Sequence, residues 1–163
     1  MKHLARILSL LILVSATVFI AACDGGDGDG PSEKDKQIDL LAGTWSASSV
    51  TLDGAAQSDY TSAFKITIAK SSSDAMTYVT VGRPAGKLSP WNANGIFTFG
   101  SDIKTQLKRD DNVNITYSLS GNTLTLTLAD YAGEGYLAPG RTETVEGDWV
   151  FTFTKESLQK ISI

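Results

Sequence analysis

The chain has 163 residues, of which 42% are hydrophobic and 20% are charged. This balance is typical of one globular domain rather than of a disordered segment. The formal net charge is −4, and the basic residues are scattered, whereas nucleic-acid binding needs clustered Lys and Arg. We therefore expect no nucleic-acid partner.

Residues 1–22 have the pattern of a secretory signal peptide. Lys2 and Arg6 give a basic start, residues 7–22 are almost wholly apolar, and small residues come last. The apolar run is shorter than the roughly 20 residues that a membrane-spanning helix needs. The pattern therefore predicts an export signal that is removed from the mature protein.

The end of this segment, Ile20-Ala21-Ala22-Cys23, resembles the lipobox of bacterial lipoproteins. The resemblance implies cleavage between Ala22 and Cys23, transfer of diacylglycerol to the Cys23 sulfur, and acylation of the new amino terminus by a chain such as palmitate. Two or three acyl chains anchor a protein stably in a membrane, whereas one does not. An ordinary signal peptide followed by an unmodified cysteine is the alternative.

Residues 23–33 read as a lipidated cysteine and a flexible acidic tether. After Cys23 they are mostly Gly, Pro and acidic residues, with no apolar side chain to bury. They do not fit a calcium-binding EF-hand, because counting from Asp27 places Ser32 and Ile38 where Gly and Glu are needed. Aspartate directly after the cysteine resembles an inner-membrane retention signal of enterobacteria. An acidic stretch there also resembles the surface-export signal of Bacteroidetes lipoproteins.

Processing at Cys23 would change the chemistry available to the mature chain. It removes Lys2 and Arg6, so the formal net charge becomes −6, and it removes His3, the one histidine. Without histidine and without a free thiol, Ser-His-Asp and Cys-His catalysis and His-ligated zinc are excluded. We expect no enzyme, no metal and no cofactor. A pair of carboxylates that hydrolyses glycosides stays open, with candidates Asp130, Glu134, Glu143, Glu146 and Asp148.

Residues 34–163 are predicted to form an all-β domain that begins with a short helical segment over residues 34–41. From there apolar residues alternate with polar ones, as in Phe64, Ile66 and Ile68, which is typical of antiparallel strands with one buried face. Turn residues separate the runs, and Gly121-Asn122 is a typical two-residue hairpin turn. The predicted strands are 43–53, 63–70, 75–83, 95–100, 104–109, 113–120, 123–130 and 147–155.

Short connections favour pairing of strands that are neighbours in sequence, while residues 131–147 are expected to form a long irregular connection. An open meander leaves two unpaired edges, and closure removes them. The prediction is an eight-stranded antiparallel up-and-down barrel, with a two-sheet β-sandwich as the alternative.

Gly43-Thr44-Trp45 resembles the Gly-x-Trp signature of the lipocalins, in which the tryptophan plugs the closed end of the barrel. The segments "GTWSASSVTLDG", "NGIFTFGSD", "NITYSLSGNTLTLTL" and "GDWVFTFTK" are similar to lipocalin-like lipoproteins of Bacteroidetes, a set largely without assigned function. This resemblance favours the outer membrane as the location. Lipocalins usually place an arginine over the tryptophan, and here the nearest basic residue is Lys155, which leaves that contact open.

The inward positions of the predicted strands are large and apolar, with no charged residue among them. Two interpretations are open: an apolar cavity that holds a small hydrophobic ligand, and a core filled by its own side chains. The candidate ligand-binding or interior residues are Trp45, Phe64, Ile66, Phe97, Phe99, Tyr117, Trp149 and Phe151.

The loops hold a second group of candidates. Trp91 lies in a polar loop over residues 84–95, where it can stack on a sugar or dock a protein, or fold over the barrel mouth. Tyr136 and Arg141 lie in the long connection. We expect a lipid-anchored cell-envelope protein that binds a small apolar ligand in its barrel. The alternative is a non-enzymatic interaction module that binds a protein or a glycan through its loops.

Overall fold

The computed structural model describes residues 30–137 and 141–157. The predicted signal peptide, the cleavage site at Ala22 and Cys23, and the first part of the tether lie outside the described residues. Among the described residues, no helix is long and apolar enough to cross a membrane.

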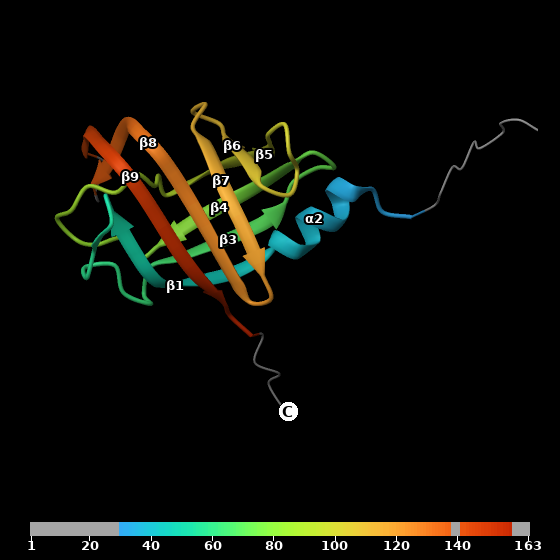
Figure 1. The fold of residues 1–163 in the computed structure, drawn as a ribbon, viewed down its shortest axis with the longest axis horizontal. Helices are drawn as coiled ribbons and strands as arrows, with labels where there is room; N and C mark the ends of the chain where they lie inside the picture. Colours follow the sequence, from blue (N-terminus) through green and yellow to red (C-terminus); the bar gives the residue numbers. More distant parts are fainter. Residues whose placement is uncertain (1–29, 138–140, 158–163) are drawn as a thin grey trace, which may run out of the picture. The chain divides into compact units, whose positions relative to one another are not determined.

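The fold is a closed antiparallel β-barrel with one short helix (Figure 1). Each long strand pairs with the next one along the chain, and β1 pairs with β9 to close the barrel. The barrel prediction is therefore confirmed over the sandwich. The elements are α2 (Glu33–Leu41), β1 (Gly43–Leu52), β2 (Ala55–Ala56), β3 (Lys65–Lys70), β4 (Ala75–Val81), β5 (Asn94–Phe99), β6 (Gln106–Arg109), β7 (Asn114–Ser120), β8 (Thr123–Leu137) and β9 (Arg141–Lys155).

Two features differ from the sequence prediction. A two-residue strand, β2, folds back on the end of β1 after a turn at Asp53 and Gly54, both of which have positive φ. The expected irregular connection over residues 131–147 is wrong, because β8 and β9 continue as a paired hairpin from Tyr131–Gly147 to Leu137–Arg141. A bulge between Leu128 and Tyr131 lets the ladder continue, since it absorbs the extra residues and re-aims the strand.

The barrel interior is packed with side chains from all its walls. Alternate residues of the strands point inward, so that Phe151 and Phe153 of β9 and Leu124, Leu126 and Leu128 of β8 are fully or almost fully buried. Of the predicted interior residues, Phe99 is only partly buried. The others are buried: Trp45, Phe64, Ile66, Phe97, Tyr117, Trp149 and Phe151.

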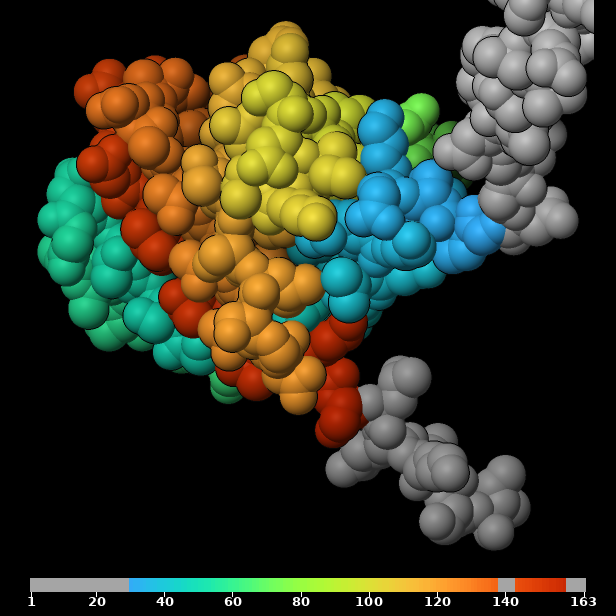
Figure 2. All heavy atoms as spheres, turned by 45° about the vertical axis from the view of Figure 1, so that its right-hand side comes forward, coloured from blue at the N-terminus to red at the C-terminus, as the bar shows by residue number. Residues whose placement is uncertain are grey.

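Helix α2 covers one end of the barrel, which we call the helix end. Figure 2 shows the helix, in blue, against the yellow residues that connect β5 and β6. Ser32 starts the helix with a reciprocal capping box to Asp35, and Ile38 and Leu41 are completely buried. The helix thereby contributes apolar side chains to the core and seals this end.

Trp45 completes the seal. Its indole nitrogen donates to the carbonyl of Leu41 at 2.8 Å. The Lys155 ammonium lies 4.9 Å from the centre of the Trp45 ring and donates to the carbonyl of Leu40 at 3.1 Å. The contact between Lys155 and Trp45 that the sequence left open is thus present.

Candidate functional site

The opposite end of the barrel is built from connections rather than from a helix, and we call it the loop end. Here β1 ends and β9 begins, and the segments 57–64 and 82–93 join the neighbouring strands. The segment 82–93 starts at Gly82, which has φ +69° and lies so close to the backbone of Ala63 that no side chain fits. Glycine therefore allows this loop to leave β4 and pass over the barrel mouth.

The loop 82–93 carries Trp91 into the barrel. Trp91 has no exposed surface, and its ring packs at 5.7 Å from Tyr78, 6.2 Å from Phe97 and 5.6 Å from Phe151, measured between ring centres. This burial removes the exposed face that stacking on a sugar would need. The tryptophan instead plugs the barrel from the loop end.

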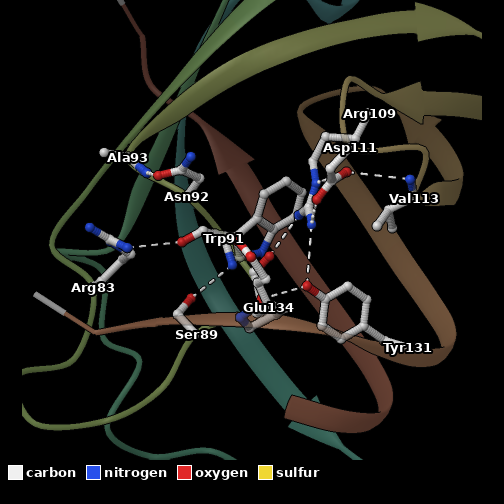
Figure 3. A network of polar contacts seen from close by, with 11 residues as sticks. Arg83, Ser89, Trp91, Asn92, Ala93, Arg109, Asp111, Val113, Tyr131 and Glu134 are labelled. Atoms are coloured by element: carbon white, nitrogen blue, oxygen red, sulfur yellow. Dashed lines mark hydrogen bonds and ion pairs between the residues drawn. The ribbon is translucent and has the colours of Figure 1, made fainter. Parts of the chain in front are cut away.

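Arg109 holds the plug in place (Figure 3). It lies at the end of β6, points inward and is 2% exposed. Its Nη1 donates to the carbonyl of Pro90 at 2.6 Å, and its guanidinium carbon lies 5.6 Å from the centre of the Trp91 ring. A second ring, that of Tyr131, lies 5.7 Å away on the β8 side. The sequence pattern predicted no charged residue inside the barrel, and Arg109 shows that this expectation is wrong. Arg109 connects the loop 82–93 to β6 and β8.

Asp111 balances the Arg109 charge with two hydrogen bonds. Arg109 Nε donates to Asp111 Oδ1 at 2.8 Å and Nη2 donates to Oδ2 at 2.6 Å. Burial alone would lower the pKa of Arg109, but the hydrogen bond to Asp111 and the nearby Tyr78 and Asp111 raise the pKa above its ordinary value. Burial works to raise the pKa of Asp111, and the Arg109 hydrogen bond and charge outweigh it and lower that pKa. Arg109 therefore stays positively charged, and its hydrogen bonds to Asp111 and Pro90 hold the fold together.

The β8–β9 hairpin is tied to the same loop. Ser89 and Tyr136 exchange two backbone hydrogen bonds, of 3.1 and 2.7 Å, and Arg83 donates to the carbonyl of Trp91 at 3.0 Å. Tyr136 is half-buried beside this bridge, so it supports the loop. The side chain of Arg141 lies outside the described part of the structure.

A pocket of about 210 Å³ opens beside this plug, between the end of β1, the start of β9 and the two loops. We call it the mouth pocket. Its apolar lining comes from Leu52, Leu88 and Val145, together with the rings of Tyr60 and Trp149. Its polar lining comes from Gln57, Asp59 and Lys87.

Two side chains of the mouth pocket carry buried polar atoms without a partner. The Tyr60 hydroxyl and the Trp149 indole nitrogen make no hydrogen bond within the described residues, although Tyr60 is only 9% exposed and Trp149 3%. The Ser89 side chain acts to lower the pKa of Tyr60, although no hydrogen bond of ordinary geometry is formed by the Tyr60 hydroxyl with another described residue. Burial raises the pKa of Tyr60 to about 12, partly offset by Ser89 and Arg83. Each unsatisfied buried group costs about 1–3 kcal/mol.

The carboxylates suggested for glycoside hydrolysis do not gather around this pocket. Asp148 and Asp130 are joined by a hydrogen bond from the Asp130 amide to the Asp148 carboxylate, and the Asp148 amide donates to Asp53. Glu134 and Glu143 line a separate hollow on the β8–β9 hairpin. Among the described residues, no group of three or more His, Cys, Asp or Glu side chains could hold a metal ion.

The sequence reasoning missed Arg109 and Tyr60. Arg109 follows Leu107 at the inward spacing of a strand, and that alternation was the available signal. Tyr60 lies in a connection with no strand pattern, so only the fold brings it to Phe64 and Trp149, with ring centres 5.1 and 6.1 Å away.

Comparison of the chain with protein-family models, with curated proteins and with solved structures found no match.

Proposed function

We propose that this chain is a lipid-anchored, lipocalin-like binding protein of the bacterial cell envelope, which takes a small ligand at the loop end of its barrel and performs no catalysis. The single observation that carries the binding proposal is that one end of the barrel is sealed, whereas the other end has an open pocket. At the helix end the Trp45 indole has a hydrogen-bond acceptor and a covering cation. At the loop end, Tyr60 and Trp149 instead line an open pocket of about 210 Å³ together with aliphatic side chains.

The packed interior supports a site at the mouth rather than in the centre. Aromatic rings contact each other from one wall to the other, with centres 4.4 Å apart for Tyr78 and Phe97, 5.7 Å for Tyr78 and Trp91, and 5.6 Å for Trp91 and Phe151. A ligand in the middle of the barrel would have to displace Trp91. A ligand in the mouth pocket displaces no core side chain.

The anchor part of the proposal is supported by the residues around Cys23. The apolar run, the lipobox-like Ile20-Ala21-Ala22 and the acidic tether resemble the corresponding parts of an exported lipoprotein. The membrane would then be a partner through the lipid, and the resemblance to lipocalin-like lipoproteins of Bacteroidetes favours the outer membrane.

Native mass spectrometry of the protein purified from bacterial cells without organic solvent tests the binding proposal. We expect a fraction with additional mass that is released on denaturation. The variant Leu88→Trp places a large ring in the mouth pocket and should lose this mass while its circular dichroism spectrum still shows the barrel. Wild-type protein that is always free of ligand, from cells and after incubation with cell-envelope extracts, would overturn the proposal.

A second candidate function is that of an interaction module with a packed barrel as scaffold. The observation that favours it is a group of exposed apolar side chains on the outer face of β4 and β5, where Val79, Val81 and Ile96 are 48%, 54% and 43% exposed. In cells, a photo-crosslinker at position 79 should then give one defined protein adduct, and the same group at the exposed position 116 on β7 should give none. A ligand-free protein with this adduct would favour the second function over the first.

A further inference from the structure

The point at which the chain enters the barrel domain determines which end of the barrel faces the membrane, an inference that rests on the proposed lipid anchor. We propose that the helix end faces the membrane that holds Cys23, so that the mouth pocket opens toward the aqueous phase on the far side of the barrel. The lipid surface is then the partner of the helix end, and a ligand reaches the mouth pocket through water or on a soluble carrier.

The chain enters the barrel domain at the helix end, through the first turn of α2. Lys34 forms an ion pair at 2.6 Å with Asp74, in the connection between β3 and β4. Asp35 forms a second one, also at 2.6 Å, with Lys70 at the end of β3. The buried side chains of α2 hold the rest of the helix against the barrel. The segment that leads back to Cys23 therefore leaves the domain from this end.

The helix end is sealed, whereas the mouth pocket opens at the other end. The Trp45 ring closes the helix end, with its indole nitrogen bound to Leu41 and the Lys155 cation against its ring. The mouth pocket lies where β1 ends and β9 begins. Figure 1 shows α2 and the hairpin of β8 and β9 at opposite ends of the barrel. The opening for a ligand is thus at the end away from the entry of the chain.

The length of the connecting segment favours the same orientation. The ten residues from Asp24 to Glu33 reach at most about 35 Å, at roughly 3.3–3.6 Å each. The ten residues of β1 run from the helix end to the loop end, which corresponds to about 25 Å along the axis of a barrel with tilted strands. Bringing the mouth to the membrane would use most of the reach of the segment, and a nearly extended chain has few conformations. The helix end therefore stays nearer to the membrane on average.

Fluorescence quenching at two matched positions tests this orientation. Lys36 lies on α2 with its side chain 56% exposed, and Lys87 lines the mouth pocket with its side chain 63% exposed. Lys36→Cys or Lys87→Cys adds one free thiol, because Cys23 is the single native cysteine and the proposed lipid occupies its sulfur. Each full-length variant is made in bacterial cells, labelled with a fluorophore and placed in phosphatidylcholine vesicles that contain lipids with a nitroxide headgroup. We expect the label at position 36 to be quenched several times more strongly than the label at position 87.

Two controls separate orientation from folding and from the surroundings of the label. Each substitution removes one exposed ion pair, with Glu33 or with Asp59, and such pairs contribute little to stability. The circular dichroism spectra should therefore still show the barrel. The same labelled proteins in vesicles without nitroxide lipids give the unquenched reference.

Equal quenching at the two positions, or stronger quenching at position 87, would overturn this inference. If the protein in these vesicles also carried an alkyne palmitate label, the proposed anchor would stand and the orientation alone would be wrong. If the full-length protein were neither labelled nor retained on the vesicles, the anchor and the orientation would both be wrong.

Discussion

Arg109 and Trp91 form the contact that closes the loop end of the barrel: the guanidinium carbon lies 5.6 Å from the centre of the indole ring. The same side chain donates to the carbonyl of Pro90, the residue before the tryptophan. A cation at the end of β6 thus fixes both the ring and the backbone of a loop that starts from β4. At the helix end, Lys155 stands over Trp45 in the same relation. Each end of the barrel therefore has a buried tryptophan covered by a cation.

Replacing Arg109 by methionine should destabilise the protein by about 2–4 kcal/mol, because Pro90 and Tyr131 lose a partner inside the barrel. The cost stays below that of a fully buried broken ion pair, since Asp111 is partly exposed and can be hydrated. Denaturation in urea measures the change. Lys108→Met, at the exposed neighbouring position, should change stability by less than about 0.5 kcal/mol. A similar loss for both variants would contradict the role assigned to Arg109.

Truncating Trp91 should open a cavity in the core. We expect Trp91→Ala to cost about 3–5 kcal/mol, as for other large-to-small changes at buried aromatic positions. Trp91→Phe should cost much less, because it keeps a ring against Tyr78 and Phe151 and gives up an indole nitrogen that has no partner among the described residues. Thermal and urea unfolding measure both. Near-wild-type stability of Trp91→Ala would mean that the loop does not plug the barrel.

The cation over Trp45 should tolerate arginine but not alanine. Lys155→Ala loses a cation–π contact and the hydrogen bond to Leu40. We expect the loss of the cation–π contact to lower the stability by about 0.5–1 kcal/mol. Lys155→Arg keeps a cation over the ring and should stay closer to wild type. Paired urea unfolding curves compare the two. If alanine and arginine were equivalent at position 155, the contact would contribute nothing measurable.

Stability should fall in acid partly through Asp35. Hydrogen bonds from Lys70 and Ser32 lower the pKa of Asp35 to about 2 from 3.8. The folded-state pKa lies below the unfolded value, so this contribution is present above about pH 4 and is lost as the pH falls towards 2. Asp35→Asn should be less stable at neutral pH and lose less stability between pH 5 and pH 2. Urea midpoints over this pH range measure it, and a wild-type slope in Asp35→Asn would contradict this contribution.

Cys23 should decide where the protein is found in cells. Cys23→Ala removes the sulfur that the proposed lipid needs, so the domain should move from the membrane fraction to the soluble fraction. Cell fractionation with immunoblotting measures this, and labelling with an alkyne palmitate analogue should mark the wild type alone. The control is Cys23→Ala in the protein made without residues 1–22, which should stay in the cytoplasm. A membrane-bound, unlabelled wild-type chain would contradict lipidation.

The sequence by itself determined the strands and their order. Alternation of apolar and polar residues is a local pattern, and a turn such as Gly121-Asn122 fixes which strands are neighbours. The predicted strands therefore agree closely with β1 and β3–β7. The pattern failed over residues 131–147, where Gly133 and Gly135 interrupt the alternation, although Val145 points inward from β9.

Only the tertiary structure decided what fills the two ends. Lys155 reaches Trp45 because β9 closes on β1, and Arg109 is buried because Pro90 and Tyr131, both distant in the chain, come to it. Tyr60 and Trp149 are likewise far apart in sequence and meet only at the barrel mouth. The hydrophobic pattern records which face of a strand is buried, but a contact between loops depends on how the barrel closes. The candidate site is made of such contacts.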